Sequence, residues 1–316
     1  MRVFSADKGF ALEPGLVFLN HGSFGARPRR VSEAQEALRR QAEASPVAFL
    51  SRQSGALLAG ARTALGAYLG SSPTDLAFVP NATTGVSIAA ASVGLGAGDE
   101  VLMSDHEYGA CDLAWERACR RAGAQVRRFQ VPLPWAGDGD FLARLEAALS
   151  PRTRVLFLSH ITSPTALRFP IAGALGLARE RGITTVIDGA HAPGHIDLDL
   201  ESLGADYYVG NCHKWLMAPL GSAFIRVAPA LQAGLDPLVS SWGLVAEERG
   251  EGGHDAYAGT EVLERRLQWL GTRDITPFLA IPAALDYLGQ MAGPGEARRC
   301  ADLSYRAARE GAGLLG

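Results

Sequence analysis

Two apolar segments that each end in a reactive side chain constrain this sequence most. Thr185-Val186-Ile187-Asp188-Gly189-Ala190-His191 is a strand-like run that ends in an acid, with a histidine three residues on. Gly210-Asn211-Cys212-His213-Lys214-Trp215 follows, and ends the next strand-like run in a lysine. A lysine can form a Schiff base with a carbonyl group, and a carboxylate can keep a pyridine nitrogen protonated. The pair is therefore typical of a site that holds a carbonyl cofactor.

Each of these two residues also has a simpler interpretation. A lysine beside a tryptophan is usually a solvated surface residue, but the strand-end position of Lys214 favours chemistry at its amine. Asp188 follows buried apolar residues, where an unpaired charge costs several kcal/mol, so the carboxylate needs a partner. A pyridinium N–H would serve as that partner. The alternative is a helix N-cap, because Asp-Gly-Ala-His can begin a helix.

Composition limits the class of protein. The chain has 316 residues, of which 47% are hydrophobic and 20% charged, as in an ordinary globular enzyme. A net charge of −3 argues against nucleic acid as a partner. Residues 1–20 carry charges and have no long apolar core, so neither a signal peptide nor a membrane span is expected. With four cysteines and no CxxC pair, we expect a reduced, cytoplasmic protein without a structural metal.

Strand-like and helix-like segments alternate through most of the chain. Strands are predicted at residues 76–79, 100–103, 125–130, 154–159, 184–187, 207–210 and 223–227. This alternation predicts an α/β fold with a mainly parallel central sheet flanked by helices. Polar clusters follow five of the strands, and ligands bind at the carboxyl ends of such strands. One shared site therefore explains them best.

The C-terminal part of the chain is less regular. Residues 238–259 are rich in Gly, Ser and Glu, and predict an irregular excursion or flexible loop. One long helix is predicted from about 277 to 291 and another from 296 to about 310. We therefore expect an N-terminal segment at 1–20, a large α/β domain at 21–275, and at 276–316 the helical start of an apparently truncated C-terminal small domain.

The turn after the first predicted strand indicates an anion site. Thr83 and Thr84 precede a helix without charge in its first turn, and hydroxyls plus free amides at a helix N-terminus bind phosphate. Plain helix capping is the alternative. The sequence contains no GxxxxGK[ST] and no GxGxxG after a first strand, which leaves nucleoside triphosphates and dinucleotides without support.

Together these segments resemble a known family. The motifs are 19–25 (LNHGSFG), 81–84 (NATT), 105–110 (DHEYGA), 163–165 (SPT), 188–191 (DGAH) and 210–215 (GNCHKW). They resemble the class V aminotransferase family of fold-type I pyridoxal-phosphate enzymes, and within it the isopenicillin-N-epimerase-like branch. The resemblance covers residues 16–288 and implies a fold-type I architecture with pyridoxal 5'-phosphate as cofactor.

The resemblance also implies roles for individual residues. Lys214 would carry the Schiff base, Asp188 would partner the pyridine nitrogen, and His191 and Ser163 would lie beside the phenolic oxygen. Thr83, Thr84 and His213 would hold the phosphate with Asn211 adjoining, and Thr272 would reach the cofactor of a partner subunit in a homodimer. Tyr108, in preference to His106, would stack on the cofactor and serve as an acid–base group. Asn20, His21 and Ser23 would line the substrate side.

The resemblance predicts chemistry at the α-carbon of an amino acid, through epimerisation or transamination. The alternatives are a C–S lyase or cysteine desulfhydrase of the same family, and a non-catalytic protein that keeps the fold. Two features depart from the family pattern. The family continues into a small domain that carries the carboxylate-binding arginine, and no residue here matches that arginine by motif. We expect either a truncated sequence or a substitute for the arginine, such as Arg168 or Arg273. Cys212 also stands where relatives often have a small residue, and its thiol would lie close to the cofactor.

Overall fold

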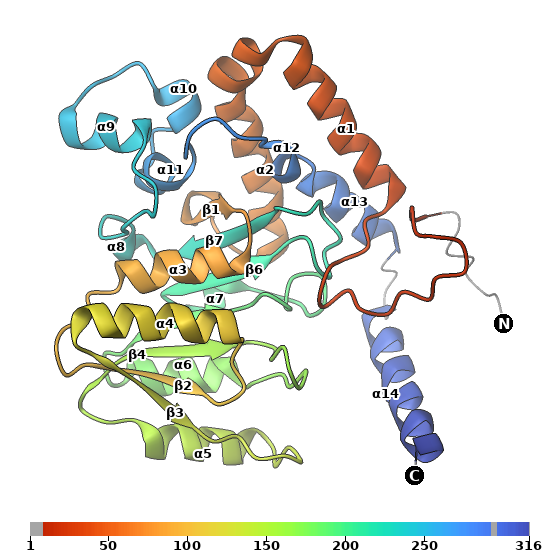
Figure 1. Cartoon of the computed structure of the whole chain (residues 1–316), viewed down its shortest axis with the longest axis vertical. Coiled ribbons are helices and arrows are strands. Elements are labelled where there is room, and N and C mark those ends of the chain that lie inside the picture. Colours follow the sequence, from red (N-terminus) through yellow and green to blue (C-terminus); the bar gives the residue numbers. More distant parts are fainter. Residues whose placement is uncertain (1–8, 292–295, 316) are drawn as a thin grey trace.

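The computed structural model describes residues 9–291 and 296–315, and a mixed sheet forms its centre (Figure 1). The described chain forms a seven-stranded sheet in the order β1-β7-β6-β5-β4-β2-β3. The strands are β1 Leu76–Val79, β2 Glu100–Ser104, β3 Gln125–Phe129, β4 Thr153–Ser159, β5 Thr184–Asp188, β6 Tyr207–Asn211 and β7 Ala223–Val227. Only β7 runs antiparallel to its neighbours β1 and β6. The predicted fold, an α/β protein with a mainly parallel sheet, is confirmed.

Helices cover both faces of this sheet (Figure 1). Their bounds are α1 Arg29–Ala44, α2 Ser54–Leu69, α3 Ala82–Ser92, α4 Gly109–Ala122, α5 Asp138–Ala148, α6 Ile171–Arg179, α7 Leu200–Leu203, α8 Pro229–Gln232, α9 Trp242–Arg249, α10 Asp255–Ala258, α11 Val262–Leu267, α12 Thr276–Leu279, α13 Ile281–Met291 and α14 Glu296–Leu315. A π-helical segment, Ala48–Gln53, and a 3₁₀ turn, Pro73–Asp75, complete the set. No helix in these described ranges is long and apolar enough to cross a membrane.

The central strands are apolar on both faces because both faces are covered. In β4, Val155 and Phe157 pack into the cluster under α3 and α4, whereas Leu156 and Leu158 pack into the cluster under α2, α5 and α6. All four side chains are at most 1% exposed. Alternation of side chains between two packed layers is what a buried parallel strand requires.

Two predictions about the C-terminal part were wrong. Residues 238–259, predicted as an irregular loop, contain the helices α9 and α10. The single helix predicted from 277 to 291 is divided into α12 and α13 at Ala280, where Pro282 in the first turn of α13 lacks the amide that would continue the hydrogen-bond ladder. The final helix, α14, extends beyond the predicted end to Leu315. Residues 1–8 and 292–295 of the predicted outer segments lie outside the described residues.

The sheet brings the sequence motifs together. Strands β1, β2, β4, β5 and β6 run in one direction, so their carboxyl ends meet at one edge. In the ladder between β4 and β5, Ser159 stands directly opposite Asp188. Every polar cluster noted in the sequence follows one of these strand ends, and the edge they share is where a ligand site forms.

Candidate active site

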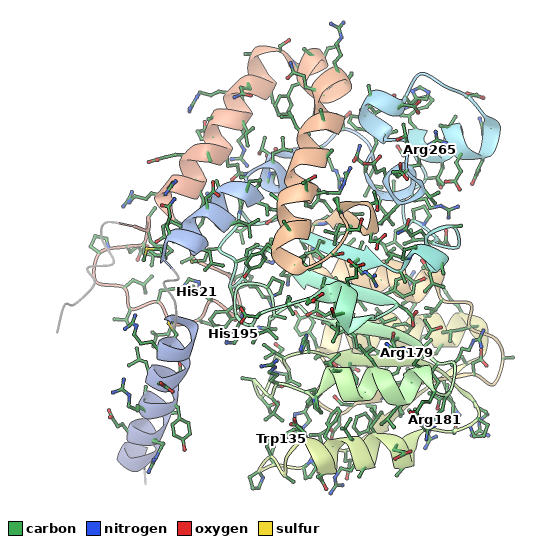
Figure 2. All side chains as sticks on the ribbon, turned by 180° about the vertical axis from the view of Figure 1, so that it is seen from behind. His21, Trp135, Arg179, Arg181, His195 and Arg265 are labelled. Carbon is green, nitrogen blue, oxygen red and sulfur yellow. The ribbon has the colours of Figure 1, made fainter. Side chains whose placement is uncertain are left out.

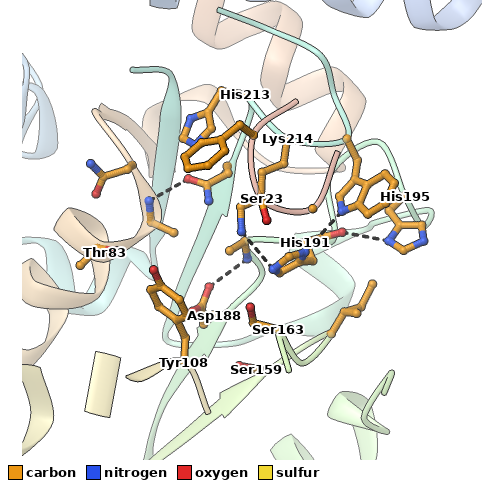
Figure 3. A pocket seen from close by; sticks show the side chains of 18 of the residues that line it. Ser23, Thr83, Tyr108, Ser159, Ser163, Asp188, His191, His195, His213 and Lys214 are labelled. Carbon is orange, nitrogen blue, oxygen red and sulfur yellow. Dashed lines mark hydrogen bonds between the residues drawn. The ribbon is translucent and has the colours of Figure 1, made fainter. Parts of the chain in front are cut away.

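A cavity of about 730 Å³ opens at this edge of the sheet (Figure 3). Its lining includes ten of the residues proposed from sequence, namely Asn20, Ser23, Thr83, Tyr108, Ser163, Asp188, His191, Asn211, His213 and Lys214. Three others, His21, Thr84 and Thr272, are not part of the lining. The cavity is of a size typical for cofactor sites.

Lys214 lies in the loop that follows β6, with its amine inside the cavity (Figure 3). Its Nζ lies 3.0 Å from Nε2 of His191. Burial lowers the pKa of the Lys214 amine, and the nearby Asp188 carboxylate opposes that shift. Burial, Lys214 and His195 together lower the pKa of His191 to about 4, so this imidazole is neutral at physiological pH. The lysine therefore faces a neutral ring.

The N-terminal segment packs directly on the Lys214 loop. The amide of Gly25 donates to the carbonyl of His213 at 3.0 Å, and a Cβ on Gly25 would lie 2.2 Å from the carbonyl oxygen of Lys214. Only glycine permits this approach. Asn20 and Ser23 hydrogen-bond to each other at the cavity, through a 2.8 Å contact between Nδ2 and Oγ. His21 instead packs its ring on Phe18 and Trp215.

Asp188 ends β5 and is 4% exposed. Its Oδ1 accepts the amide of Ala190 at 2.9 Å, and its Oδ2 accepts the thiol of Cys111 at 3.5 Å. Burial raises the pKa of this carboxyl group, and these two donors together with Lys214 oppose the shift. In the described chain the next helix after Asp188 is α7, which begins at Leu200, so the carboxylate closes a turn and does not cap a helix. A cationic donor in the cavity would stabilise its ionised form.

The N-terminus of α3 forms the opposite end of the cavity. Asn81 caps the helix by accepting from the amide and the hydroxyl of Thr84, at 2.9 and 3.0 Å. Asn211 accepts the amide of Ala82 at 2.8 Å, which ties the end of β6 to this helix. Thr83 lines the cavity, and within the described residues its backbone carbonyl accepts from the Ser87 hydroxyl while its own hydroxyl makes no hydrogen bond. Thr83 is thus free for a phosphate, whereas Thr84 serves the helix cap.

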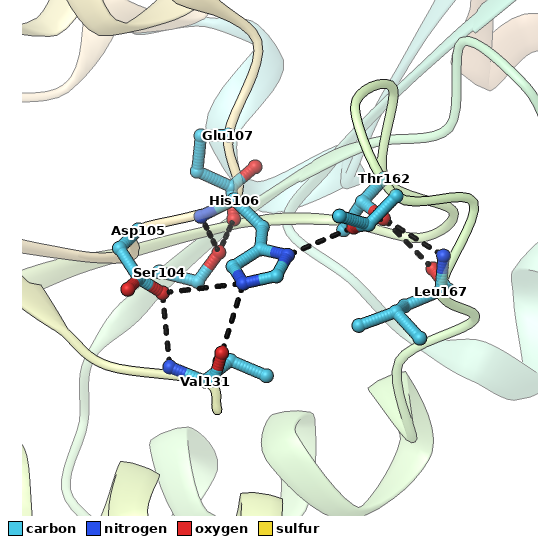
Figure 4. Close-up of polar contacts among 8 residues, drawn as sticks. Ser104, Asp105, His106, Glu107, Val131, Thr162 and Leu167 are labelled. Carbon is cyan, nitrogen blue, oxygen red and sulfur yellow. Dashed lines mark hydrogen bonds and ion pairs between the residues drawn. The ribbon is translucent and has the colours of Figure 1, made fainter. Parts of the chain in front are cut away.

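His106 and Tyr108 differ sharply in environment. The ring of His106 is buried, with Nε2 donating to the carbonyl of Val131 at 2.9 Å and Nδ1 accepting from Thr165 at 2.8 Å. Through Thr165 and Thr162 this ring supports the loop that carries Ser163 (Figure 4). The Tyr108 side chain is 47% exposed and lines the cavity. Tyr108 is therefore the ring that can reach a ligand.

Glu107 lies buried beneath the site, and the sequence alone did not indicate any role for it. Its carboxyl group contacts the Ser104 hydroxyl at 2.6 Å and accepts both the amide and the hydroxyl of Ser159, at 2.8 and 2.6 Å. These contacts join the ends of β2 and β4. Burial raises the pKa of Glu107 to about 7, and the charge of Asp188 adds to that rise against the serine hydrogen bonds.

A Glu107→Gln variant tests this raised pKa. The pKa is about 7 in the folded protein against 4.5 for an unperturbed glutamate, so wild-type stability decreases as pH rises through that window and stays low above it. Glutamine mimics the neutral acid and removes this loss. We therefore expect the stability of the variant, minus that of wild type, to increase from about pH 5 to about pH 8, as measured by urea unfolding. The same difference in unfolding free energy between variant and wild type at both pH values would contradict the expectation.

The chemistry of these groups fits pyridoxal phosphate. An amine, a buried carboxylate with room for one more donor, and a helix N-terminus with a free hydroxyl face one cavity. They match the aldehyde, the ring nitrogen and the phosphate of that cofactor. Neither Arg168 nor Arg273 lines the cavity, and the Arg273 guanidinium stacks on Phe278 and donates to the carbonyl of Gln268 instead.

Three residues around Lys214 were not assigned roles from sequence. His195 lines the cavity four residues after His191, and the Trp215 ring stacks with the rings of both His195 and His21. Figure 2 labels His21 and His195, the two histidines that pack on Trp215, as seen from behind. Cys111 contacts Asp188 from α4. The i,i+4 spacing of the two histidines was visible in the sequence, whereas the Cys111 contact joins residues 77 positions apart.

Comparisons with known proteins agree with this geometry. The Aminotransferase class-V family model matches residues 18–303. Isopenicillin N epimerase from Streptomyces clavuligerus is 42% identical over 290 residues, which is 91% of this chain and 72% of the relative. Putative L-cysteine desulfhydrase 1 from Oryza sativa subsp. japonica is 31% identical over 301 residues, 89% of this chain and 59% of the relative.

A solved structure shares the fold. It is a lysine-to-alanine mutant of C-DES with glycine covalently linked to its PLP cofactor. That structure superimposes with a TM-score of 0.77 at 24% identity and covers 90% of this chain and 74% of the solved one. The chain therefore belongs to the class V aminotransferase family of pyridoxal-phosphate enzymes.

Proposed function

We propose that this protein removes and returns the α-proton of an amino acid, and that inversion of the α-carbon is its net reaction. The contact between Lys214 and His191 carries this proposal. It places the Lys214 amine beside a neutral imidazole, in the same cavity as the buried Asp188 carboxylate. The 42% identity to isopenicillin N epimerase, against 31% to a desulfhydrase, favours inversion over elimination.

Each residue has a defined task in this reaction. Pyridoxal phosphate, when bound, supplies an electron sink for the charge that remains at the α-carbon. Lys214 takes the α-proton as a general base, for which its lowered pKa suits it. Asp188 holds a proton on the pyridine nitrogen through its buried carboxylate. Thr83 and the N-terminus of α3 would hold the phosphate, at the opposite end of the cavity from Lys214.

Elimination from a cysteine derivative is the second candidate. It begins with the same proton transfer and differs only in the bond that breaks next. The similarity to the Oryza sativa desulfhydrase supports it. A protein that binds the cofactor without turnover is the third, supported by the lack of an arginine among the described residues that line the cavity.

One experiment separates these functions. Purified protein loaded with pyridoxal phosphate is incubated in D₂O with isopenicillin N and, separately, with L-cysteine. We expect deuterium at the α-carbon and a mixture of both configurations, detected by NMR and chiral chromatography. Sulfide and pyruvate from cysteine without inversion would establish elimination instead. Absence of both exchange and product, with the cofactor bound, would establish a non-catalytic protein.

A Thr83→Val substitution tests the phosphate site. Valine keeps the shape of threonine and removes the hydroxyl that lines the cavity. The loss of a hydrogen bond to a charged group, about 1.5 kcal/mol, is expected to weaken cofactor affinity by about tenfold. Thr84→Val is the matched control, because its hydroxyl bonds to Asn81 and is not part of the lining. Equal losses in both variants, measured by fluorescence titration, would argue against this assignment.

We also propose a homodimer in which Thr272 contacts the phosphate in the partner's cavity. Thr272 is exposed and does not line the cavity of its own chain. In a mixture of Lys214→Ala and Thr272→Ala subunits, each hybrid dimer would hold one site with both residues intact. We expect such mixing to raise activity above that of either variant alone. Purely monomeric sedimentation would overturn the proposal.

The remaining assignments follow the same proposal. We assign the cofactor-binding unit to residues 21–275, since the whole cavity lining except Asn20 falls within it. We propose a cytoplasmic location, which the free thiols of Cys111, Cys119 and Cys212 support because thiols persist in reducing compartments. Fractionation of the source cells would test this.

A further inference from the structure

The ring of His191 has two contacts that constrain where its proton lies. The indole N–H of Trp215 donates to Nδ1 at 3.4 Å, and Nε2 faces the Lys214 amine at 3.0 Å (Figure 3). A neutral imidazole carries one N–H, so a ring that accepts at Nδ1 must carry its hydrogen on Nε2. That hydrogen points at Lys214, and only an uncharged amine has a lone pair to accept it.

Trp215 is held firmly in the position that makes this contact. Its ring stacks on His195 with centroids 4.4 Å apart, and on His21 from the N-terminal segment at 6.0 Å. Gly194 fits tightly against the same residue, because a Cβ there would lie 2.5 Å from the carbonyl oxygen of Trp215. A Cβ on Gly22 would contact both the indole and the His191 ring. Two separate segments, 21–22 and 194–195, therefore fix the direction of the indole N–H.

We propose that Trp215 is a positioning residue whose indole N–H holds His191 in the Nε2–H tautomer and so keeps Lys214 a neutral amine. The proposal rests on the proposed function, because it concerns the lysine that binds the cofactor. A neutral amine is the form that attaches to pyridoxal phosphate: its nitrogen bonds to the aldehyde carbon, and the aldehyde oxygen leaves as water. An ammonium group has no lone pair for that bond.

The other groups around Lys214 do not keep its amine neutral in the same way. Asp188 and Cys111 face the amine from β5 and α4 and favour its charged form. His195 and His213 lie nearby, and burial lowers the pKa of both rings. Removing the indole N–H frees His191 to adopt the Nδ1–H tautomer, whose Nε2 accepts from a charged Lys214. Loss of the Trp215 hydrogen bond therefore favours the ammonium form.

The test compares variants of the full chain after its cofactor has been removed. Trp215→Phe keeps an aromatic ring for stacking and lacks the N–H, and Trp215→Ala lacks both. Trp242→Phe is the matched control, because Trp242 packs on His254 with centroids 4.6 Å apart on the distant α9. The rate at which the visible band of bound pyridoxal phosphate appears is recorded across neutral and alkaline pH.

We expect Trp215→Phe to load about fivefold more slowly than wild type at neutral pH, the factor that corresponds to a net hydrogen bond of about 1 kcal/mol. The pH dependence of its loading rate should move to higher pH, whereas that of Trp242→Phe should match wild type. If Trp215→Phe loads like wild type and only Trp215→Ala is slow, stacking is what matters and the proposal is wrong.

A second measurement does not depend on the variants. Nitrogen-15 NMR of the cofactor-free wild type should show the His191 proton on Nε2, and a proton on Nδ1 would overturn the proposal even if the variants fail to fold. Failure of the wild-type protein to bind pyridoxal phosphate would reject the proposed function instead. The NMR result would still decide the tautomer.

Discussion

Replacing Lys214 with alanine is expected to abolish covalent attachment of pyridoxal phosphate and to lower kcat by about three orders of magnitude or more. Two functions are lost together, because the same amine binds the cofactor and moves the α-proton. In the described part of the chain, Lys214 is the lysine that lines the cavity, and His191, with a pKa lowered to about 4, already contacts it. The visible band and the rate of α-deuterium exchange measure the two losses separately.

The small number of lysines in the chain makes this test easy to interpret. The sequence has only two lysines, Lys8 and Lys214, among 30 lysine and arginine residues. Reduction with borohydride followed by peptide mass spectrometry should place the pyridoxyl group on Lys214, and Lys8→Ala should leave both band and activity intact. Lys214→Arg places a long cationic side chain there that cannot form the covalent bond. A wild-type band that survives in Lys214→Ala would remove this lysine from its proposed role.

The strands and their convergence were predictable for a simple physical reason. A run such as Phe157 and Leu158, apolar at successive positions, has both faces buried, which identifies a parallel strand from composition alone. Once the strands are parallel, their carboxyl ends share an edge, so Asp188 and Lys214 had to approach each other. The position of Thr83 near the start of a helix followed from the strand predicted at 76–79 and the helix predicted after it.

What the sequence could not predict depends on contacts between distant segments. The helices at 242–258 form where α9 and α10 touch other helices backbone to backbone. A Cβ on Gly243 would lie 1.9 Å from the carbonyl oxygen of Arg265, and one on Gly55 would lie 2.3 Å from that of Ala256. The local sequence, rich in Gly and Glu, predicts a loop because nothing in it indicates these partners. The Cys111 contact with Asp188 was hidden for the same reason.

Replacing Asp188 with asparagine should separate cofactor binding from catalysis. The variant is expected to keep the visible band, since Lys214 and the phosphate site are intact, but to slow α-proton exchange by a factor of about 100 to 10,000. An amide cannot keep a pyridine nitrogen protonated, so the cofactor loses its capacity to accept charge. In the wild-type protein burial raises the pKa of the Asp188 carboxyl, and a cationic partner such as the pyridinium would oppose that rise.

A cofactor analogue methylated at the ring nitrogen distinguishes this effect from a loss of structure. The analogue is permanently positive, so it needs no carboxylate to hold a proton, and it should restore much of the exchange rate in Asp188→Asn. Cys111→Ser is the matched control, because serine keeps a donor toward Oδ2 and should leave the rate within about threefold of wild type. If Asp188→Asn exchanges as fast as wild type, the buried acid serves only the turn that it closes through Ala190, and the charge of the ring nitrogen is set elsewhere.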